Sequence, residues 1–471
     1  MLRINGRTAR VCDGFTRREV LEVGGLGALG LMLSDVLRLQ SRAANSAQQA
    51  RKADACILVF LFGGPSQIDT FDMKPLAPSE FRGEFQPIET NVPGISICEH
   101  FPQLAAQADK FAILRSMNHL HPRHGYGLHY MFTGREHPRP DLDAPPTPGD
   151  FPSLGSLVAK LQAPRADFPP AVTLPRWNRF LDVPNDYAGE LAGFLGKNYD
   201  PWLVRAEPNT SEFAVSGIDL PAGMSIDRLA GRRELLDSIK SRLARIADTE
   251  QVGQHDSLYR QAFALVTSPQ ARVAFDLERE PAALRDRYGQ GPFGQGLLLS
   301  RRLVEAGASL VTVNWHDDGS DVKSPFWDTH KDNFRTLKDK LIPPVDRGLS
   351  ALLQDLSARG LLDRTLVIVM GEFGRTPRIG RVVMNAATDS TGRDHWPHAY
   401  SVLLAGGGVR GGQVYGASDD RAAYVVDGSV TPPDLVATVL TCLGIDTASR
   451  IYDRQGRPHF ACEGRPITGL F

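Results

Sequence analysis

The sequence predicts an α/β protein with a mostly parallel central sheet and helices on both of its faces. From Arg51 onward, short runs of Val, Ile, Leu and Phe alternate with longer segments that carry apolar residues at helical spacing. Continuous apolar runs are typical of strands buried on both sides, and their alternation with helices is typical of a parallel sheet. The 471 residues, 42% hydrophobic and 23% charged, are enough for a large buried core.

Five apolar runs are predicted to be strands of this sheet. They are Cys56–Phe62, Phe111–Leu114, Ser309–Trp315, Leu366–Met370 and Ser401–Ala405. Amphipathic helices are predicted at Arg228–Ile246, Ser257–Leu265 and Val345–Leu362. The region from about Phe180 to Gly289 therefore predicts a largely helical insertion between two halves of the sheet.

The overall charge argues against a polyanionic partner. Lys and Arg number 53 against 54 Asp and Glu, which gives a formal net charge of −1. Binding to nucleic acid or to an anionic membrane surface depends on a strong positive field. We therefore expect no nucleic-acid partner, and no transmembrane span is predicted.

The first fifty residues have a different character from the rest. Arg17 and Arg18 precede an uncharged, Gly-rich apolar stretch between Glu22 and Asp35, and small polar residues follow. This order resembles a twin-arginine export signal, and the apolar stretch is far shorter than the ~20 residues of a membrane span. Residues 1–50 are thus predicted to be a signal and linker, and residues 51–471 one domain of an exported, periplasmic or cell-envelope protein.

The five cysteines are widely separated and form no C-x-x-C motif. A thiolate metal site is therefore not expected. Cys442 and Cys462 are close enough in sequence for one disulfide bridge, and two buried free thiols are the alternative.

Clusters of His, Asp and Glu stand beside nearly every predicted strand. Ligands of an open parallel sheet bind beyond the carboxyl ends of the strands, so we expect the clusters to converge on one edge. They are Gly63–Asp72, Asn118–His129, His316–His330, Gly371–Arg375 and Gly392–His398.

Imidazole and carboxylate groups together suit divalent metal ions. A mixed nitrogen and oxygen shell favours Zn²⁺ or Mn²⁺, and an all-oxygen shell favours Mg²⁺ or Ca²⁺. One or two such ions can polarise a tetrahedral ester. Each cluster taken singly also has a structural interpretation, such as a helix cap at Asp328 or a tight turn at Gly63.

The segment Asp346–Arg375 resembles the superfamily of alkaline phosphatases, sulfatases and cofactor-independent phosphoglycerate mutases. Its helix leads into LVIVMGEFGR, which is similar to the sulfatase helix and strand that deliver an Asp metal ligand. Glu372 takes the place of that Asp. The resemblance implies an alkaline-phosphatase-like fold with Glu372 as a metal ligand.

A second segment, Phe101–Pro138, is similar to the sulfatase run that carries the nucleophile. Alignment on Thr133-Gly134-Arg135 puts His124 in the nucleophile's position, and no Cys lies nearby. A formylglycine sulfatase is therefore not expected. His124 is left as a nucleophile that forms a phospho-imidazole, as the group that orients the attacking water, or as an extra metal ligand.

The resemblance implies further ligands on three other segments. The superfamily places Asp directly after the first strand, where this chain has two glycines, so Asp69 or Asp72 would have to reach the site. Asp328 and His330 resemble the phosphatase Asp-x-x-x-His pair at a shorter spacing. The late His ligand of the superfamily corresponds to either of two residues, His395 and His398.

The whole mature chain resembles the domain of unknown function 1501 family. The phrases GGPSQIDTFD, WDTH, GEFGRTP and GRDHWP carry this resemblance, together with the twin-arginine leader. The family has no assigned reaction, so the resemblance implies the fold and not the chemistry.

These observations lead to two hypotheses. The first is an exported metal-dependent hydrolase of phosphate or sulfate esters, with a small-molecule or carbohydrate substrate. In it, His124 acts on the ester or on water, and Arg375 and Arg393 neutralise oxyanion charge. One or two ions are held among Asp69, Asp328, His330, Glu372, His395 and His398. The second hypothesis is a non-catalytic binding or cell-envelope protein, because the first-strand Asp and the usual nucleophile are absent.

Overall fold

The structure, a computed structural model, describes most of the chain from Arg51 to Phe471. It leaves out residues 140–142, 164, 166–167, 181–184, most of 206–268, 317–325 and 386. The predicted leader and the predicted helix Ser257–Leu265 lie outside the described residues, as does nearly all of Arg228–Ile246. No helix in the part of the chain that is described combines the length and the hydropathy of a membrane span.

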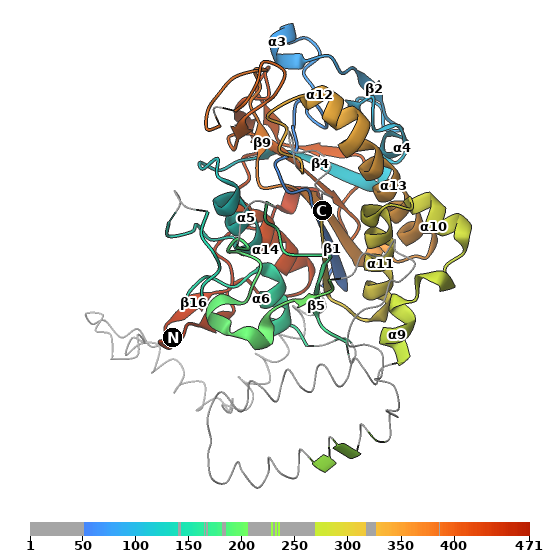
Figure 1. Cartoon of the computed structure of the whole chain (residues 1–471), viewed down its shortest axis with the longest axis vertical. Coiled ribbons are helices and arrows are strands. Elements are labelled where there is room, and N and C mark those ends of the chain that lie inside the picture. The colour runs from blue at the N-terminus through green and yellow to red at the C-terminus, as the bar shows by residue number, and fades with distance from the viewer. Residues whose placement is uncertain are drawn as a thin grey trace, which may run out of the picture. The chain divides into compact units, whose positions relative to one another are not determined.

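The centre of the fold (Figure 1) is a twisted sheet that includes β4, β1 and β5. It has eight strands in the order β12-β4-β11-β8-β1-β7-β5-β6. Every neighbouring pair is parallel except the two pairs that β11 makes with β4 and β8. The strands are β1 (Ala55–Phe60), β4 (Phe111–Met117), β5 (Ala171–Leu174), β6 (Trp202–Leu203), β7 (Leu310–Asn314), β8 (Thr365–Met370), β11 (Tyr400–Ala405) and β12 (Gln413–Tyr415). The predicted fold class, a mostly parallel sheet in an α/β protein, is confirmed.

Burial explains why the central strands could be predicted. All six residues of β1 are buried, as are all six of β8, because both faces of the sheet are covered. In register, Cys56 of β1 lies between Leu310 of β7 and Leu366 of β8. The five predicted strands are all present, although β4 continues to Met117, three residues beyond its predicted end. The short strands β5, β6 and β12 were not predicted, since two to four residues are too few to give a periodic signal.

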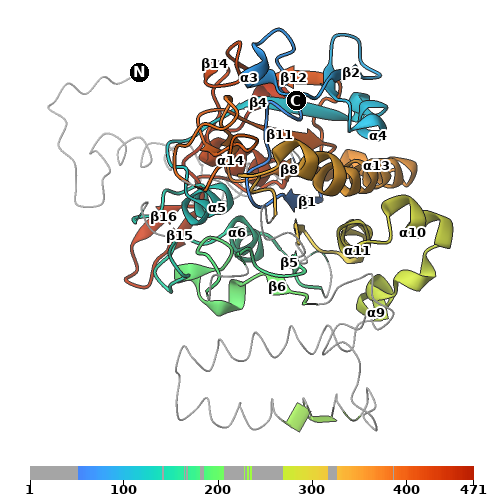
Figure 2. The same ribbon diagram turned by 45° about the horizontal axis from the view of Figure 1, so that its top comes forward.

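Two groups of helices cover the sheet, one on each side (Figure 2). On one side α11 contacts β1 and β7 and packs on α13, which contacts α10. On the other side α14 packs on α5, and α6 contacts β5. The bounds are α5 (His124–Thr133), α6 (Leu154–Leu161), α10 (Ala282–Tyr288), α11 (Pro292–Ala306), α13 (Ile342–Ala358) and α14 (Pro432–Cys442). The predicted helix Val345–Leu362 is therefore confirmed as α13, starting and ending a few residues earlier.

Shorter elements surround this framework. The shorter helices are α3 (Ser79–Arg82), α4 (Pro102–Ala105), α9 (Pro269–Phe275) and α12 (Asn333–Thr336). The strand pairs are β2 (Pro87–Glu89) with β3 (Ser96–Cys98), β9 (Gly374–Arg375) with β10 (His395–Trp396), β13 (Ala417–Ser418) with β14 (Val425–Asp427), and β15 (Arg450–Tyr452) with β16 (Pro458–Phe460). Within the predicted insertion the described residues include β6, α9 and α10, and β6 belongs to the central sheet.

The four described cysteines are buried free thiols. Cys462 donates a hydrogen bond from its Sγ to the carbonyl of Pro433 at 3.2 Å and is not bonded to Cys442. The two alternatives predicted for Cys442 and Cys462 were one disulfide bridge and two buried free thiols, and the structure contains the free thiols.

Candidate functional site

Five of the predicted site residues meet at the carboxyl ends of the parallel strands. Glu372 follows β8, Asp328 and His330 precede α12, His124 is the first residue of α5, and His395 lies in β10. All five are buried. We call them the strand-end cluster.

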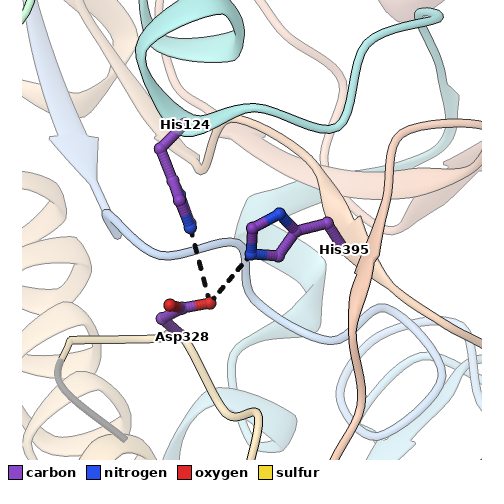
Figure 3. A group of neighbouring side chains, drawn as sticks. All are labelled: His124, Asp328 and His395. Atoms are coloured by element: carbon purple, nitrogen blue, oxygen red, sulfur yellow. Dashed lines mark hydrogen bonds and ion pairs between the residues drawn. The ribbon is translucent and has the colours of Figure 1, made fainter. Parts of the chain in front are cut away.

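The cluster centres on one carboxylate oxygen. Oδ1 of Asp328 lies 2.9 Å from Nε2 of His330, 3.1 Å from Nε2 of His395 and 3.5 Å from Nε2 of His124. Figure 3 shows the imidazoles of His124 and His395 directed at this oxygen from two different segments. The Nε2 atoms of His330 and His395 are also 3.0 Å from each other. Three imidazole nitrogens thus converge on one oxygen.

The opposite nitrogen of each imidazole is held by a second partner. The Nδ1 contacts are His124 to Oε1 of Glu372 at 2.6 Å, His330 to Oγ1 of Thr388 at 2.8 Å, and His395 to the carbonyl of Pro122 at 2.6 Å. Such contacts fix the ring orientation and aim the other nitrogen, as in histidines that bind metals.

One of these contacts fixes where the proton of His395 lies. A carbonyl oxygen only accepts, so Nδ1 of His395 donates to Pro122. In a neutral imidazole, Nε2 then carries a lone pair, and it faces the acceptor Oδ1 of Asp328 at 3.1 Å. Two lone pairs therefore point at each other across a distance that a cation can bridge.

The electrostatics of the cluster follow from its acids. Burial alone raises the pKa of the Asp328 carboxyl, but Arg375 and His124 outweigh burial and hold that pKa well below its ordinary value. Burial alone lowers the pKa of His124, yet the Asp328 and Glu372 carboxylates raise it to about 9. Burial, with the nearby charge of His124, lowers the pKa of His395 to about 3.

Glu372 holds the cluster to the end of the first strand. Its Oε1 accepts from the backbone N–H of Gly63 at 2.9 Å and contacts Nδ1 of His124. Its Oε2 is buried and has no hydrogen-bond partner among the described residues. A buried carboxylate oxygen without a partner is costly, so this atom is a candidate cation ligand.

Arg375 supports the cluster from within. Its guanidinium donates to Oδ1 of Asp328 and to the carbonyls of Gly63 and Gly64, and it is fully buried. The predicted role was neutralisation of oxyanion charge. The structure directs the guanidinium instead at Asp328 and at the loop after β1, so it positions that carboxylate.

Two other predicted residues, Asp69 and Arg393, pair with each other away from Asp328. Arg393 binds Asp69 through Nε at 2.7 Å and Nη2 at 2.9 Å, and both side chains are buried. Ser66 and Asn333 also donate to Asp69, while Arg393 donates to the carbonyls at Phe81, Thr376 and Pro377. Because internal partners use these groups, the pair joins two loops; neither side chain joins the strand-end cluster.

His398, the alternative late ligand, also lies apart from the strand-end cluster. Its ring packs 4.7 Å from Trp396 and 5.5 Å from Tyr424, centroid to centroid. Of the two candidates, the structure brings His395 to Asp328.

The glycine after the first strand has a steric reason. Gly63 has φ 115°, and a Cβ there would lie 2.5 Å from the backbone nitrogens of Trp327 and Asp328. The backbone of the segment that carries Asp328 therefore occupies the space that any side chain at position 63 would need. The departure noted in the sequence makes room for the carboxylate at the centre of the cluster.

Two supporting residues, Asp394 and Thr388, were missed. Asp394 accepts three backbone N–H groups at residues 383–385 through Oδ2, and its Oδ1 lies 3.6 Å from Nδ1 of His330. Asp394 precedes His395 in the phrase GRDHWP, so its position was visible in the sequence, but no pattern there marks it as a loop organiser. Thr388 lies in a loop that no periodic pattern describes.

The eight-stranded sheet and the buried imidazole and carboxylate groups at its edge define the class: an α/β protein with a site beyond the carboxyl ends of its strands. The chain belongs to the family described as "Protein of unknown function (DUF1501)", whose model matches residues 53–471. A search of curated proteins gave no match.

Several solved structures are similar in fold at low sequence identity. A phosphonate monoester hydrolase from Silicibacter pomeroyi is 13% identical with a TM-score of 0.39, covering 88% of this chain and 76% of its own. A sulfatase from Pseudoalteromonas sp. is 13% identical with a TM-score of 0.37, covering 86% and 72%. A protein in the alkaline phosphatase superfamily from Vibrio parahaemolyticus is 12% identical with a TM-score of 0.33, covering 84% and 67%.

Proposed function

We propose that the protein is a metal-dependent hydrolase of phosphate or sulfate esters. One observation carries the proposal. Nε2 of His395 and Oδ1 of Asp328 face each other at 3.1 Å, and both are acceptors when Nδ1 of His395 donates to Pro122. Nε2 of His330 lies beside them, 2.9 Å from the same oxygen. A divalent cation would satisfy all three atoms. The residues present therefore fit a metal ion.

The chemistry of the donors narrows the ion. His330 and His395 offer imidazole nitrogen, and Asp328 offers carboxylate oxygen. This mixture suits Zn²⁺ or Mn²⁺ better than Ca²⁺ or Mg²⁺. Oε2 of Glu372 is a further oxygen donor, and a bound ion would supply Lewis acidity toward the ester.

We assign to His124 one of two roles, either general base toward the attacking water or nucleophile toward the ester. Glu372 accepts from Nδ1 of His124 at 2.6 Å, which orients the ring and leaves Nε2 directed into the cluster. An imidazole held by a carboxylate in this way acts as a general base through its other nitrogen. In this proposal Nε2 takes the proton from the attacking water, or attacks directly. With a metal ion bound to Asp328, this carboxylate would no longer stabilise the protonated form of His124, and the neutral imidazole that the proposed role requires would be favoured.

The test combines metal content with turnover. Protein purified without chelator should hold a divalent ion in stoichiometric amount and should turn over at least one ester in a panel of phosphate monoesters, phosphate diesters and sulfated sugars. The double variant Glu372→Gln/His395→Ala should lose both properties. His398→Ala is the matched control, since it removes a histidine three positions away that does not join the cluster, and it should keep both.

The alternative function is a non-catalytic binding protein. One observation favours it: the guanidinium of Arg375, which could have met an oxyanion, is directed at Asp328 and at two backbone carbonyls. Stoichiometric metal without turnover of any ester in the panel would favour this alternative. Absence of metal in wild-type protein would contradict the hydrolase.

Export through the twin-arginine pathway is part of the proposal. It is supported by the Arg17-Arg18 pair ahead of the apolar stretch. Arg17→Lys/Arg18→Lys should leave the full-length precursor in the cytoplasm on cell fractionation, whereas export unchanged by this double substitution would contradict the proposal.

A further inference from the structure

A cavity of about 630 Å³ lies just beyond the carboxyl end of β7. Its walls are the end of α10, the glycine-rich segment 289–294 that leads into α11, the start of α13, and Trp315 just after β7. The Trp315 ring lies 5.6 Å from the ring of Trp327, which directly precedes Asp328. The contact between the two rings places the cavity next to the segment that carries Asp328.

The charged side chains among the described residues of the cavity wall are cationic. Arg176, Lys340 and Arg347 line it together with His316, and none of its described lining residues is an Asp or Glu. Cations that line a concave surface concentrate anions there, because the low-dielectric walls focus their field. The cavity therefore selects for a negatively charged ligand.

Both arginines of the cavity have hydrogen-bond partners within the protein. Nη2 of Arg176 donates to Nε2 of His316 at 2.9 Å, and Nε of Arg347 donates to the carbonyl of Arg287 at 3.4 Å. A guanidinium with five N–H donors can keep such a contact and still bind an oxyanion. Ordering these side chains costs little further entropy when a ligand binds.

The start of α11 adds to the positive potential. This 15-residue helix begins at Pro292 after Gly291, with no side-chain cap and no acidic residue in its first turn. The amides at such an end carry partial positive charge. Gly294 permits this arrangement, because a Cβ there would lie 2.1 Å from the carbonyl of Tyr288.

An aromatic wall faces the same space. The rings of Phe293 and Trp315 lie 4.9 Å apart, and both residues line the cavity. Aromatic faces pack against the apolar faces of sugar rings, while cations bind the charged substituents. The combination fits a ring that carries an oxyanion.

We propose that this cavity is a subsite for a second phosphate or sulfate group of the substrate, so that the substrate is a carbohydrate ester with at least two charged groups. The inference rests on the proposed function for the role of the ligand as a substrate. The anion site itself depends only on the cavity. The two can therefore fail separately.

The first experiment measures binding without turnover. Glucose 6-phosphate, glucose 6-sulfate and glucose are titrated by calorimetry into protein that carries His395→Ala, which removes a ligand of the metal centre. Lys340→Gln/Arg347→Gln should weaken binding of one or both anionic sugars roughly tenfold or more, from the loss of charge-assisted hydrogen bonds. Glucose should bind detectably to none of the proteins.

The control double variant, Arg335→Gln/Lys338→Gln, removes the same charge from two exposed positions nearby on the chain. It should bind like its parent. Equal loss in both double variants would mean a non-specific charge effect, and absence of binding to the parent would mean that the cavity is no oxyanion site; either result overturns the proposal. Lys340→Gln alone covers the case in which loss of Arg347 disturbs folding, and it should weaken binding in the same direction.

The second experiment asks whether the cavity serves the reaction. Lys340→Gln/Arg347→Gln should raise KM by a clearly larger factor on glucose 1,6-bisphosphate than on glucose 1-phosphate, and on both esters kcat should fall by less than KM rises. A KM that rises equally on both esters would overturn the substrate role. If wild-type protein hydrolyses no ester but the anionic sugars still bind in the cavity, the hydrolase proposal fails and the anion site stands.

Discussion

Two groups of largely buried charged residues in this molecule are built in opposite ways. The first is the strand-end cluster around Asp328. The second, which we call the helix network, joins α10, α11 and α13 and contains three arginines and three acids: Arg301, Arg302, Arg359, Glu280, Glu305 and Asp355. In the helix network the charges alternate, and each carboxylate meets at least two guanidinium groups.

The helix network lowers the energy of its own members. Arg301 lies 2.8 Å from Glu280 and 3.0 Å from Asp355, and the Tyr288 hydroxyl donates to Asp355 at 3.0 Å. Burial alone would raise the pKa of the Glu280 carboxyl, but Arg301 and Arg302 together lower it. The charges of this network therefore compensate one another without a bound ligand.

The strand-end cluster does the reverse. Three imidazole nitrogens and an arginine share one oxygen of Asp328, while Oε2 of Glu372 has no partner among the described residues. Imidazole nitrogens and carboxylate oxygens that are held close together, with too few protons to form hydrogen bonds between all of them, destabilise the folded state unless an ion or ligand binds there. Burial of charge therefore does not by itself mark a functional site. Buried polar atoms that lack complementary partners do.

The largest effect on stability is expected in the helix network. Arg301→Ala should lower the free energy of unfolding by about 3–5 kcal/mol, because it removes the buried guanidinium between Glu280 and Asp355 and leaves them only the more exposed Arg359 in common. Urea denaturation followed by circular dichroism measures this. Arg457→Ala, which removes an exposed arginine paired with Asp453, is the control and should cost about 1 kcal/mol or less. Equal losses of unfolding free energy in the two variants would mean that Arg301 stabilises the protein no more than an exposed ion pair does.

Asp69 is expected to behave like a member of the helix network. Asp69→Asn should lower the free energy of unfolding by about 3 kcal/mol, since buried Arg393 then loses its charge partner. Metal content should stay at the wild-type level, because Asp69 lies apart from the strand-end cluster. Asp363→Asn, at an exposed position, should change neither quantity. Loss of metal in Asp69→Asn would return Asp69 to the ligand set that the sequence suggested.

The fate of Asp69 shows how far sequence reasoning reaches. The strands could be predicted because buried β1 and β8 are continuous apolar runs. The ends of those strands then located Glu372 and the segment of Asp328, since parallel strands share one edge. The pairing of Asp69 with Arg393 spans 324 positions along the chain, and it depends on loop paths that no local pattern encodes. For the same reason sequence could not choose between His395 and His398.

At the strand-end cluster, bound metal should change the free energy of unfolding more than loss of a single side chain does. In metal-free protein, His395→Ala should lower the free energy of unfolding by clearly less than Arg301→Ala does, because removal of the poorly matched Nε2 offsets part of the loss of ring packing and of the hydrogen bond to Pro122. Adding Zn²⁺ or Mn²⁺ at 100 times the dissociation constant should stabilise wild-type protein by about 2.7 kcal/mol. Thermal unfolding with and without metal should show this shift for wild type and for His398→Ala, and not for His395→Ala. A metal-free loss as large as that of Arg301→Ala would make the cluster a structural network.

Glu190 is the intermediate case, a buried acid that has amide partners and no cation in contact with it among the described residues. Its carboxyl accepts from the backbone N–H of Asn178 and from the side chains of Asn178 and Asn314. Burial raises its pKa to about 7, although these hydrogen bonds act in the opposite direction. Between its ordinary pKa of 4.5 and about 7, the folded protein therefore binds more protons than the unfolded chain.

The free energy of unfolding should consequently fall as pH rises through this window, by roughly 1 kcal/mol per pH unit from this one group. Glu190→Gln cannot titrate, so it should remove that slope and add only a constant offset from one mismatched donor. Denaturant titrations of both proteins at pH 5, 6, 7 and 8 give the difference in slope, free of the other titrating groups. A parallel pair of curves would mean that Glu190 titrates alike in the folded and unfolded protein. The amide donors alone would then suffice to hold a buried carboxylate, and the mismatch at Asp328 and Glu372 would be less costly than the contrast with the helix network implies.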